Sequence, residues 1–375
     1  MILPGSWIGL LGGGQLGRMF TISARSMGYK VVVLDPDRSS PAGQIADRHL
    51  QQPYIDEGAL TEIGKLCGVV TTEFENVPAQ ALAFLAARCP VHPRAESLAI
   101  AQDRLLEKGF ARQHGIETAR FAAVGSESDI AGAWAEIGGT GILKTSRLGY
   151  DGKGQRTVAS LEEAGAAFRA FGGVKCILEQ RVELVREISV VLARSPSGQI
   201  VSFPAGENVH VDGILDTTTV PAMMSPALAE RARCAAETLA RALEYVGVLG
   251  VELFVIPGDR LLFNEMAPRP HNSAHYTMDA CVTDQFEQQV RAVCGLPLGD
   301  PSLLSPVCMV NLLGDVWSKG TPRWDQALTD PRVKLHLYGK TEARPGRKMG
   351  HLNVLADTPE NARRHALAAR ERLIP

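Results

Sequence analysis

The sequence lacks any large surplus of charge. Its 375 residues contain 41 Asp and Glu against 39 Lys and Arg, which leaves a formal net charge of -2. It also lacks an apolar run of the roughly 18 residues that a membrane span needs, and its N-terminus has neither the charged region nor the cleavage site of a secretion signal. These absences argue against nucleic acid or a membrane as a partner, and we expect a cytoplasmic protein that acts on small molecules.

Cysteine is scarce and widely scattered. The seven cysteines are an odd number and form no C-x-x-C pair, so neither a disulfide framework nor a zinc site is predicted. With 45% hydrophobic and 21% charged residues, the composition is that of an ordinary globular protein, which excludes collagen, coiled coil and disorder. The length predicts two or three domains at about 150 residues each.

The first hundred residues alternate short apolar runs with helical patterns, which is typical of a parallel α/β sheet. The first apolar run, 7–11, leads into Gly12-Gly-Gly-Gln-Leu-Gly17, which satisfies G-x-G-x-x-G, and Asp35 closes the second predicted strand. Taken alone, this pattern indicates a dinucleotide-binding fold, so an NAD-dependent dehydrogenase is one hypothesis. The alternative is a tight strand-to-helix turn without a ligand, and the motif does not decide between the two.

The pattern of predicted secondary structure changes after residue 100. A helix is predicted over 103–114, two hairpins over 188–203 and 250–265, and a long helix that begins at Pro226 with Ser225 as its N-cap. A linker-like segment near residue 297 precedes three further strand patterns and a final helix. The predicted domains are 1–100, 101–297 and 298–375.

A glycine-rich loop follows the predicted strand 141–145. It begins at Lys144, contains Gly149, Gly152 and Gly154, and includes a second lysine at Lys153. Such a loop can fold over a polyphosphate with its amides pointing inward, while the two ammonium groups neutralise the phosphates. A solvated hairpin tip is the alternative.

The predicted hairpin 250–265 carries acidic residues in apolar strands. Glu252 lies within one strand, and Asn264 with Glu265 ends the next, so pairing across the hairpin can bring their oxygens together. Hard oxygen ligands of this kind suit Mg2+ bound to a nucleotide, and two buried carboxylates without a cation would be costly. The alternative is a carboxylate paired with Arg269.

Two further segments have polar residues that suit anions. Arg269, His271 and Asn272 follow the hairpin on a proline-stiffened loop, although a structural hydrogen bond is the default role for a lone histidine. The segment 338–351 has four Lys and Arg residues, which favours either a phosphate-monoester pocket or a solvated basic turn.

A weaker signal comes from the strand that ends at residues 179–182. Its main chain could bind an adenine edge, and Glu187 could accept hydrogen bonds from ribose hydroxyls. Carboxylates such as Glu179 and Glu187 beside an apolar strand are more often surface charge.

In this order, the segments resemble the ATP-grasp family and, within it, the 5-(carboxyamino)imidazole ribonucleotide synthetases. The resemblance runs from Gly9 to nearly the C-terminus. It rests on the stretches Gly12–Met19, Thr72–Val77, Gly149–Gln155, Glu207–His210, Asn264–Ser273 and Gly339–Gly350.

The resemblance implies a mixed α/β and α+β architecture: an N-terminal Rossmann-like domain, a two-lobed ATP-grasp domain and a small β-rich C-terminal domain. It implies that the early glycine turn faces the acceptor substrate rather than NAD. The implied reaction is the ATP- and bicarbonate-dependent carboxylation of the amine of 5-aminoimidazole ribonucleotide through carboxyphosphate. Its products are 5-(carboxyamino)imidazole ribonucleotide, ADP and phosphate. The implied cofactors are ATP and Mg2+, and the implied assembly is a homodimer. A formate-dependent ribonucleotide transformylase of the same fold is the alternative.

The resemblance also implies the site residues. Those implied to bind ATP are Arg104, Lys144, Gly149, Tyr150, Asp151, Gly152, Lys153, Gly154, Gln155, Glu179, Gln180, Arg181, Val182, Glu187, His210, Asn264 and Glu265. Those implied to bind the ribonucleotide are Gln15, Glu73, Asp151, Arg269, His271, Asn272, Lys340 and Arg347. The implied catalytic residues are Asp151, Lys153, Arg269, His271 and Asn272, and the implied Mg2+ ligands are Glu252 and Glu265.

Three positions depart from the family pattern. Ser146 and Leu148 stand where Arg and Phe are frequent, and Ala274 stands where Gly is frequent. None of these departures falls on a residue to which the resemblance assigns a charged role.

Overall fold

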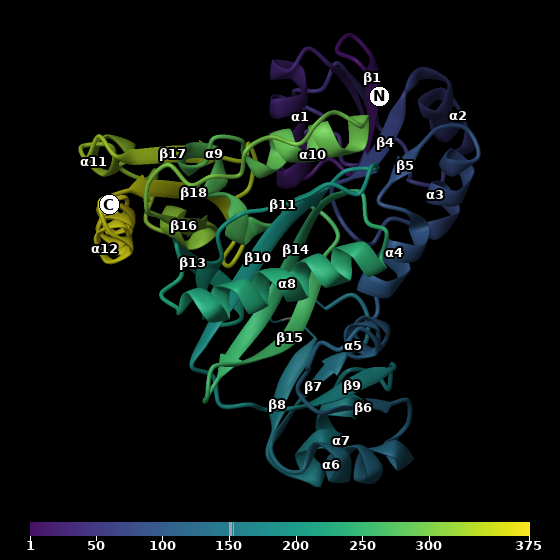
Figure 1. Ribbon diagram of the computed structural model, residues 1–375, viewed down its shortest axis with the longest axis vertical. Coiled ribbons are helices and arrows are strands. Elements are labelled where there is room, and N and C mark those ends of the chain that lie inside the picture. The colour runs from purple at the N-terminus through teal and green to yellow at the C-terminus, as the bar shows by residue number, and fades with distance from the viewer. Residues whose placement is uncertain (150–151, 153) are drawn as a thin grey trace.

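The computed structural model describes residues 1–149, 152 and 154–375, and these residues form three sheets. A parallel sheet, a small antiparallel sheet and a large antiparallel sheet follow one another along the chain. Figure 1 shows the small sheet with its helices at the opposite end of the molecule from the N-terminus. The large sheet lies between them and extends sideways to the C-terminal helix.

The N-terminal region comprises β1 (Trp7–Leu11), α1 (Gln15–Ser26), β2 (Lys30–Leu34), β3 (Arg48–Leu50), α2 (Glu57–Leu66), β4 (Val69–Thr72), α3 (Ala79–Ala86), β5 (Val91–His92) and α4 (Ala95–Ala101). Its strands are parallel in the order β3-β2-β1-β4-β5. Strand β2 is apolar at consecutive positions because helices cover both faces of the sheet. Val31 packs in one core with α1, and Val32 packs in another with α2. The predicted parallel α/β region is confirmed.

The small lobe comprises α5 (Arg104–Gln113), β6 (Phe121–Val124), the 3-10 turn η1 (Glu127–Asp129), α6 (Ile130–Ile137), β7 (Gly141–Thr145), β8 (Gln155–Val158), α7 (Leu161–Ala170) and β9 (Cys176–Gln180). Its four strands have the order β6-β9-β7-β8. Helices α6 and α7 share a core with one face of this sheet, which includes Leu143 and Leu178. The other face is free to line the cleft described below.

The large sheet begins with β10 (Arg186–Arg194), β11 (Ile200–Ser202), β12 (Gly206–Val211), β13 (Ile214–Val220), β14 (Gly247–Ile256) and β15 (Arg260–Ala267). Helix α8 (Pro226–Ala242) lies between β13 and β14 in the sequence. Helix α8 starts as predicted, because the Ser225 side chain accepts a hydrogen bond from the Leu228 amide. It covers one face of the sheet, where Val251 and Leu253 are buried. Because side chains alternate along a strand, Glu252 between them faces the other side.

The C-terminal part contains β16 (Val307–Leu313), the 3-10 turn η3 (Gly314–Trp317), α11 (Trp324–Ala327), β17 (Val333–Leu337), β18 (Lys348–Leu355) and α12 (Pro359–Arg372). Its three strands do not make a sheet of their own. Strand β16 pairs antiparallel with β13, so the large sheet runs β15-β14-β10-β12-β13-β16-β18-β17, with β11 paired to β10. The boundary at residue 298 therefore stays a prediction, since hydrogen bonds cross it.

One buried helix joins the N-terminal sheet to the large sheet. The segment after β15 contains the 3-10 turn η2 (Asn272–Ala274), α9 (Thr277–Ala280) and α10 (Gln285–Cys294). Phe286 of α10 packs in the N-terminal core. Gln289 of the same helix donates to Thr71 Oγ1 of β4 at 3.0 Å and accepts from the Val248 amide of β14. This helix fixes the position of the N-terminal sheet relative to β14 and its acidic side chains.

Within residues 1–149, 152 and 154–375, none of the helices has the length and apolar character that a membrane span requires.

Candidate active site

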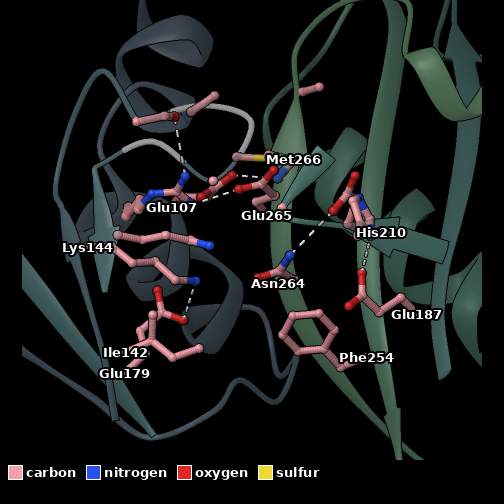
Figure 2. Close-up of a pocket in the computed structure, with 18 of the residues that line it drawn as sticks. Glu107, Ile142, Lys144, Glu179, Glu187, His210, Phe254, Asn264, Glu265 and Met266 are labelled. Carbon is pink, nitrogen blue, oxygen red and sulfur yellow. Dashed lines mark hydrogen bonds and ion pairs between the residues drawn. The ribbon is translucent and has the colours of Figure 1, made fainter. Parts of the chain in front are cut away.

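A cleft of about 830 Å3 opens between the small lobe and the large sheet. The small lobe contributes Lys144 and Glu179, while the sheet contributes Asn264 and Glu265. Figure 2 shows these two groups facing each other across the gap. Glu75, from the loop after β4, also lines the cleft. The cleft therefore combines side chains from parts of the chain that are far apart in sequence.

A β-bulge shapes the acidic wall. Glu252 pairs with Glu265 across the β14–β15 hairpin, but Leu253 pairs with Phe263, so Asn264 is the extra residue. A bulge changes the direction of the side chains beside it, and here both Asn264 and Glu265 line the cleft. The Asn264 amide nitrogen lies 3.4 Å from Glu252 Oε2. The predicted convergence of these three residues is present.

The two carboxylates of this wall have different electrostatic surroundings. Burial raises the pKa of Glu265, but Arg104, whose Nη1 lies 2.7 Å from Glu265 Oε2, outweighs burial and holds the pKa at about 2. Burial and the neighbouring Glu265 charge raise the pKa of Glu252 to about 7. Arg104 therefore balances the charge of Glu265, whereas no described Lys or Arg is paired with Glu252.

The alternative pairing of these carboxylates with Arg269 is wrong. The Arg269 guanidinium instead pairs with Glu75, with Nε 2.7 Å from Oε2. Burial raises the pKa of Glu75, and Arg269 more than reverses this, so the carboxylate is charged. Arg104, which the resemblance implies to bind ATP, forms the ion pair with Glu265.

A buried carboxylate between two lysines forms the opposite wall. Glu179 Oε2 lies 3.1 Å from Lys144 Nζ and 3.3 Å from Lys108 Nζ, and the Glu179 side chain is 3% exposed. The alternative of surface charge is therefore wrong for Glu179. Although burial raises its pKa, the two lysines hold it at about 2. With two ammonium groups and one carboxylate, this wall has an excess of positive charge.

Lys108 was not predicted. Its side chain is fully buried, and Nζ also donates to the Asn264 carbonyl at 2.9 Å. Beside it on α5, Glu107 accepts from the Met266 amide, and burial raises the pKa of Glu107 well above its usual range. Helix α5 thereby connects the small-lobe wall to the bulge of β15.

The nucleotide-binding residues expected on β9 and on the sheet line the cleft. Gln180, Arg181 and Val182 follow the buried Glu179. Glu187 and His210 lie on the neighbouring strands β10 and β12, with Nδ1 of His210 2.6 Å from Glu187 Oε2. Burial lowers the pKa of His210, but the Glu187 hydrogen bond and nearby carboxylates raise it by more.

The predicted loop over the cleft is described in part. Gly149, Gly152 and Gln155 line the cleft, and the Gly154 carbonyl accepts from the Thr145 amide at 2.8 Å. Tyr150, Asp151 and Lys153 lie outside the described residues.

The three departures from the family pattern do not place a charge in the cleft. Ser146 donates to Asp103 at 2.7 Å, Leu148 is exposed, and Ala274 is buried in the core of the large sheet.

The glycine amides of the early turn already donate hydrogen bonds within the chain. The Gly13 amide donates to Asp35 at 2.7 Å, and the amides of Gly14 and Gly17 donate to Glu73 at 2.7 and 3.0 Å. A ligand phosphate would have to displace these carboxylates, which belong to the chain itself. The turn is therefore the strand-to-helix connection that was the alternative, and the NAD hypothesis loses its basis.

The remaining residues predicted to bind the ribonucleotide adjoin the cleft rather than line it. Lys340 Nζ donates to Gln15 Oε1 and to the Lys348 carbonyl, both at 2.6 Å. Arg347 donates to the Glu342 carbonyl at 2.9 Å. The described residues that line the cleft include Lys348 but not Gln15, Glu73, Lys340 or Arg347.

The three residues of the proline-stiffened loop all line the cleft. His271 Nε2 lies 3.4 Å from Glu252 Oε1, and its Nδ1 lies 2.7 Å from the Ser273 hydroxyl. Burial and the Arg269 charge lower the pKa of His271 to about 3, so the ring is neutral. The Asn272 amide exchanges hydrogen bonds with Asn311 on β16, at 2.8 and 3.1 Å.

An antiparallel lobe that faces a larger sheet across a cleft with lysines on one wall and paired carboxylates on the other defines an ATP-grasp protein. The model of the ATP-grasp domain matches residues 109–286. A ribonucleotide synthetase preATP-grasp domain matches 6–102, and a phosphoribosylaminoimidazole carboxylase C-terminal domain matches 307–365.

The chain belongs to the N5-carboxyaminoimidazole ribonucleotide synthase family, whose members are ATP-dependent ligases of purine biosynthesis. It is 50% identical over 351 residues to the N5-carboxyaminoimidazole ribonucleotide synthase of Brucella melitensis, covering 93% of this chain and 96% of that one. The crystal structure of an ADP complex of such a synthetase, 42% identical, matches with a TM-score of 0.93 over 98% of this chain and 97% of that one. An Aspergillus clavatus synthase in complex with ADP and 5-aminoimidazole ribonucleotide, 30% identical, matches with a TM-score of 0.88 over 98% and 99%.

Proposed function

We propose that the cleft binds ATP, bicarbonate and 5-aminoimidazole ribonucleotide and forms N5-carboxyaminoimidazole ribonucleotide, ADP and phosphate. The observation that carries this proposal is the opposition of two walls of unlike charge: Glu179 with two lysines on one side, and Glu252 with Glu265 on the other. A nucleoside triphosphate with a divalent cation is complementary to both walls at once. Related proteins were crystallised with ADP and with ADP plus the aminoimidazole ribonucleotide, which supports the same site here.

The nucleotide would lie along the small-lobe wall. The main chain of 179–182 would bind adenine, and Glu187, held by His210, would accept the ribose hydroxyls. Lys144 and Arg104 would neutralise the phosphates, with Lys153 and the glycines of the loop above them. Binding of the phosphates would draw Lys144 away from Glu179, which keeps Lys108 as its counterion.

The residues of the sheet wall fit a Mg2+ ion. Asn264 Oδ1 is buried and has no hydrogen-bond partner among the described residues, and Glu252 and Glu265 add carboxylate oxygens, which are hard ligands. Across the described residues there is no cluster of three His, Cys, Asp or Glu side chains able to hold a metal ion. An ion here would therefore share its coordination with the phosphates, where it would offset their negative charge.

The first chemical step would transfer the γ-phosphoryl group to bicarbonate. A bicarbonate oxygen attacks phosphorus, the bond to the ADP oxygen breaks, and carboxyphosphate forms. Arg269 would stabilise this anion, since Glu75 holds its Nε and fixes the direction of the guanidinium. Lys348 and Asn272 also line this end of the cleft. Closure of the loop would keep water from the intermediate.

In the second step the amine would attack the carboxyl carbon of carboxyphosphate, or of CO2 released from it. The bond to phosphate breaks, and the amine gives up a proton. Gln15, Glu73, Asp151, His271 and Asn272 would lie around the ring and the carboxyphosphate, while Lys340 and Arg347 would hold the ribose phosphate. Glu73 would act with both oxygens already bonded to backbone amides, which fixes its orientation. We further propose that the protein acts in the cytoplasm as a homodimer.

Phosphate release tests the proposal. We expect release with ATP, Mg2+, bicarbonate and 5-aminoimidazole ribonucleotide, and none when formate and glycinamide ribonucleotide replace the last two. The opposite pattern would assign the chain to the formate-using transformylases. ATP binding without release in either mixture would indicate a nucleotide sensor.

A further inference from the structure

The bulge of β15 lies at the edge of the large sheet. Strand β15 ends the sheet order, so among the described strands of that sheet it pairs only with β14. Backbone groups on its outer edge need partners elsewhere, because a buried N–H or C=O group without a hydrogen bond is costly. Before the bulge, the Phe263 amide donates to the Glu117 carbonyl at 2.7 Å. At residues 264 and 266 the partners are side chains of helix α5 instead.

Glu107 and Lys108 supply these partners. Lys108 Nζ donates to the Asn264 carbonyl at 2.9 Å, and Glu107 Oε1 accepts from the Met266 amide. Figure 2 shows Glu107 beside Met266. One side chain thus offers a donor and the next an acceptor, which is what the backbone of a neighbouring strand would offer at this edge.

A third side chain of α5 holds the residue in between. Arg104 lies one turn before Lys108, at the i, i+4 spacing that places two side chains on the same face of a helix. Its guanidinium pairs with the Glu265 carboxylate, with Nη1 2.7 Å from Oε2. One face of α5 therefore holds the three consecutive residues 264–266 of β15.

Water cannot easily replace these partners, because the contact is buried. Glu107 and Lys108 are 2% and 0% exposed, and Asn264 and Met266 are buried as well. Removal of either α5 side chain would leave a backbone group of β15 unpaired in the interior, which destabilises this conformation of the strand. Because a bulge sets the direction of the side chains beside it, the direction of Asn264 would change with the conformation of the strand.

Lys108 also joins the bulge to the opposite wall of the cleft. Its Nζ lies 3.3 Å from Glu179 Oε2 on β9 of the small lobe. An ammonium group has three N–H donors, so the same group can bond to Glu179 and to the Asn264 carbonyl. The two walls are therefore connected at this point through one side chain.

We infer that Glu107 and Lys108 are positioning residues, which take the place of a further strand at the edge of β15 and hold the bulge so that Asn264 and Glu265 face the cleft. This inference rests on the proposed role of Asn264 and Glu265 toward Mg2+. Loss of a group that orients metal-binding side chains typically changes metal affinity or activity by about 10- to 100-fold. Loss of either α5 contact should therefore weaken the effect of Mg2+ on nucleotide binding, although every proposed ligand is still present.

Amide hydrogen exchange in the substrate-free, full-length protein tests the structural part of the inference. We expect the Met266 amide to exchange at least about tenfold faster in Glu107→Leu than in the parent, because the variant removes its acceptor. Glu107→Gln keeps a carbonyl oxygen of the same reach and should keep the parent rate. An unchanged Met266 rate in a folded Glu107→Leu protein would overturn the inference, whether or not the ligase activity is confirmed.

Titration calorimetry of ADP binding with and without Mg2+ tests the functional part. We expect the factor by which Mg2+ strengthens ADP binding to be about tenfold smaller in Glu107→Leu and in Lys108→Met than in the parent. Glu107→Gln should keep the parent factor, and a parent factor in Glu107→Leu would contradict the inference. If Mg2+ does not strengthen ADP binding to the parent itself, the proposed function fails, and hydrogen exchange still decides whether α5 holds the bulge.

A matched variant separates positioning from a general loss of stability. Gln288 on α10 is fully buried and bonds to both the amide and the carbonyl of Gly299. Gln288→Leu therefore removes a buried side-chain partner of the backbone and should lower stability, but it should keep the parent effect of Mg2+. An equal loss of the Mg2+ effect in Gln288→Leu and Glu107→Leu would contradict the inference.

If Glu107→Leu does not fold, the Lys108→Met, Glu179→Gln double variant takes its place. The second substitution removes the buried carboxylate that Lys108 neutralises, but the Asn264 carbonyl still lacks its donor. We expect the double variant to recover stability relative to Lys108→Met while its Mg2+ effect stays reduced. Recovery of both would show that Lys108 acts only as a counterion of Glu179 and would overturn its positioning role.

Discussion

The buried carboxylates on the two walls of the cleft differ in the cations that accompany them. On the small-lobe wall, the Glu179 carboxylate lies between the ammonium groups of Lys108 and Lys144, and Figure 2 shows Lys144 and Glu179 side by side on this wall. On the sheet wall, Glu265 has Arg104, but no Lys or Arg among the described residues is paired with Glu252, and its pKa rises to about 7. The small-lobe wall therefore balances its carboxylate within the chain and keeps one cation in excess, whereas the sheet wall gains most from an added cation. The following variants test this difference, from the largest expected effect to the smallest.

The stability of the small-lobe wall should depend strongly on the buried Lys108. Lys108→Met removes a fully buried cation from Glu179 and a donor from the Asn264 carbonyl. We expect the free energy of unfolding, measured with urea, to fall by about 3 kcal/mol. The exposed Lys65→Met is the control. Adding Glu179→Gln to Lys108→Met should recover part of the loss, and equal stability of the two lysine variants would contradict this account of the wall.

The sheet wall should matter more for catalysis than for stability. Glu265→Gln keeps a similar shape and a hydrogen bond to Arg104 but removes the charge proposed to bind Mg2+. We expect phosphate release to fall by about 100- to 1000-fold. Glu230→Gln, at an exposed position on α8, should release phosphate at the parent rate. Parent-like turnover by Glu265→Gln would show that this carboxylate is not a ligand.

Glu75 connects the N-terminal region to the anion-binding end of the cleft. Glu75→Gln weakens the hydrogen bond that Arg269 Nε donates to Glu75 Oε2 at 2.7 Å, which joins two charged groups in the parent. Because hydrogen bonds to charged groups contribute about 1.5–3 kcal/mol, we expect kcat/KM for bicarbonate to fall at least about tenfold with ADP affinity unchanged. Glu96→Gln on α4 is the matched control. A change in ADP affinity without a change for bicarbonate would place Arg269 on the nucleotide instead.

The smallest effect concerns pH. Burial and the Glu265 charge raise the pKa of Glu252 from 4.5 to about 7. Between these values the folded protein holds a proton that the unfolded chain has released, so this group lowers the free energy of unfolding as the pH rises through that window. We therefore compare the free energies of unfolding of Glu252→Gln and the parent without Mg2+ or nucleotide. The value for the variant minus that for the parent should be larger at pH 7.5 than at pH 4.5. A difference independent of pH would be inconsistent with a raised pKa.

Local features of the fold could be predicted from the sequence. The apolar runs of β1, β2 and β4 indicated a parallel sheet, Ser225 and Pro226 indicated the start of α8, and the apolar strands around Glu252 indicated the hairpin. Each signal lies within about twenty residues and depends on periodicity or capping. The strands β12 and β13 were not predicted, because polar residues such as Thr217 break the apolar pattern.

The partners of the charged residues could not be predicted. Arg104 meets Glu265 across 161 residues of sequence, and Arg269 meets Glu75 across 194. Periodicity assigns a face to a side chain but does not say which distant element covers it. For the same reason the glycine turn suggested a phosphate site, although Glu73, 59 residues from Gly14, already occupies its amides. The resemblance to a family supplied the roles that the residues alone left open.

ADP binding with and without Mg2+ tests the central claim most directly, namely that the carboxylates of the sheet wall hold the nucleotide through a divalent cation. Titration calorimetry at pH 7.5 would compare the parent with the Glu252→Gln, Glu265→Gln double variant. We predict that Mg2+ strengthens ADP binding to the parent at least about tenfold, which is about 1.4 kcal/mol, and leaves binding to the double variant unchanged. An equal strengthening by Mg2+ in both proteins would contradict the account.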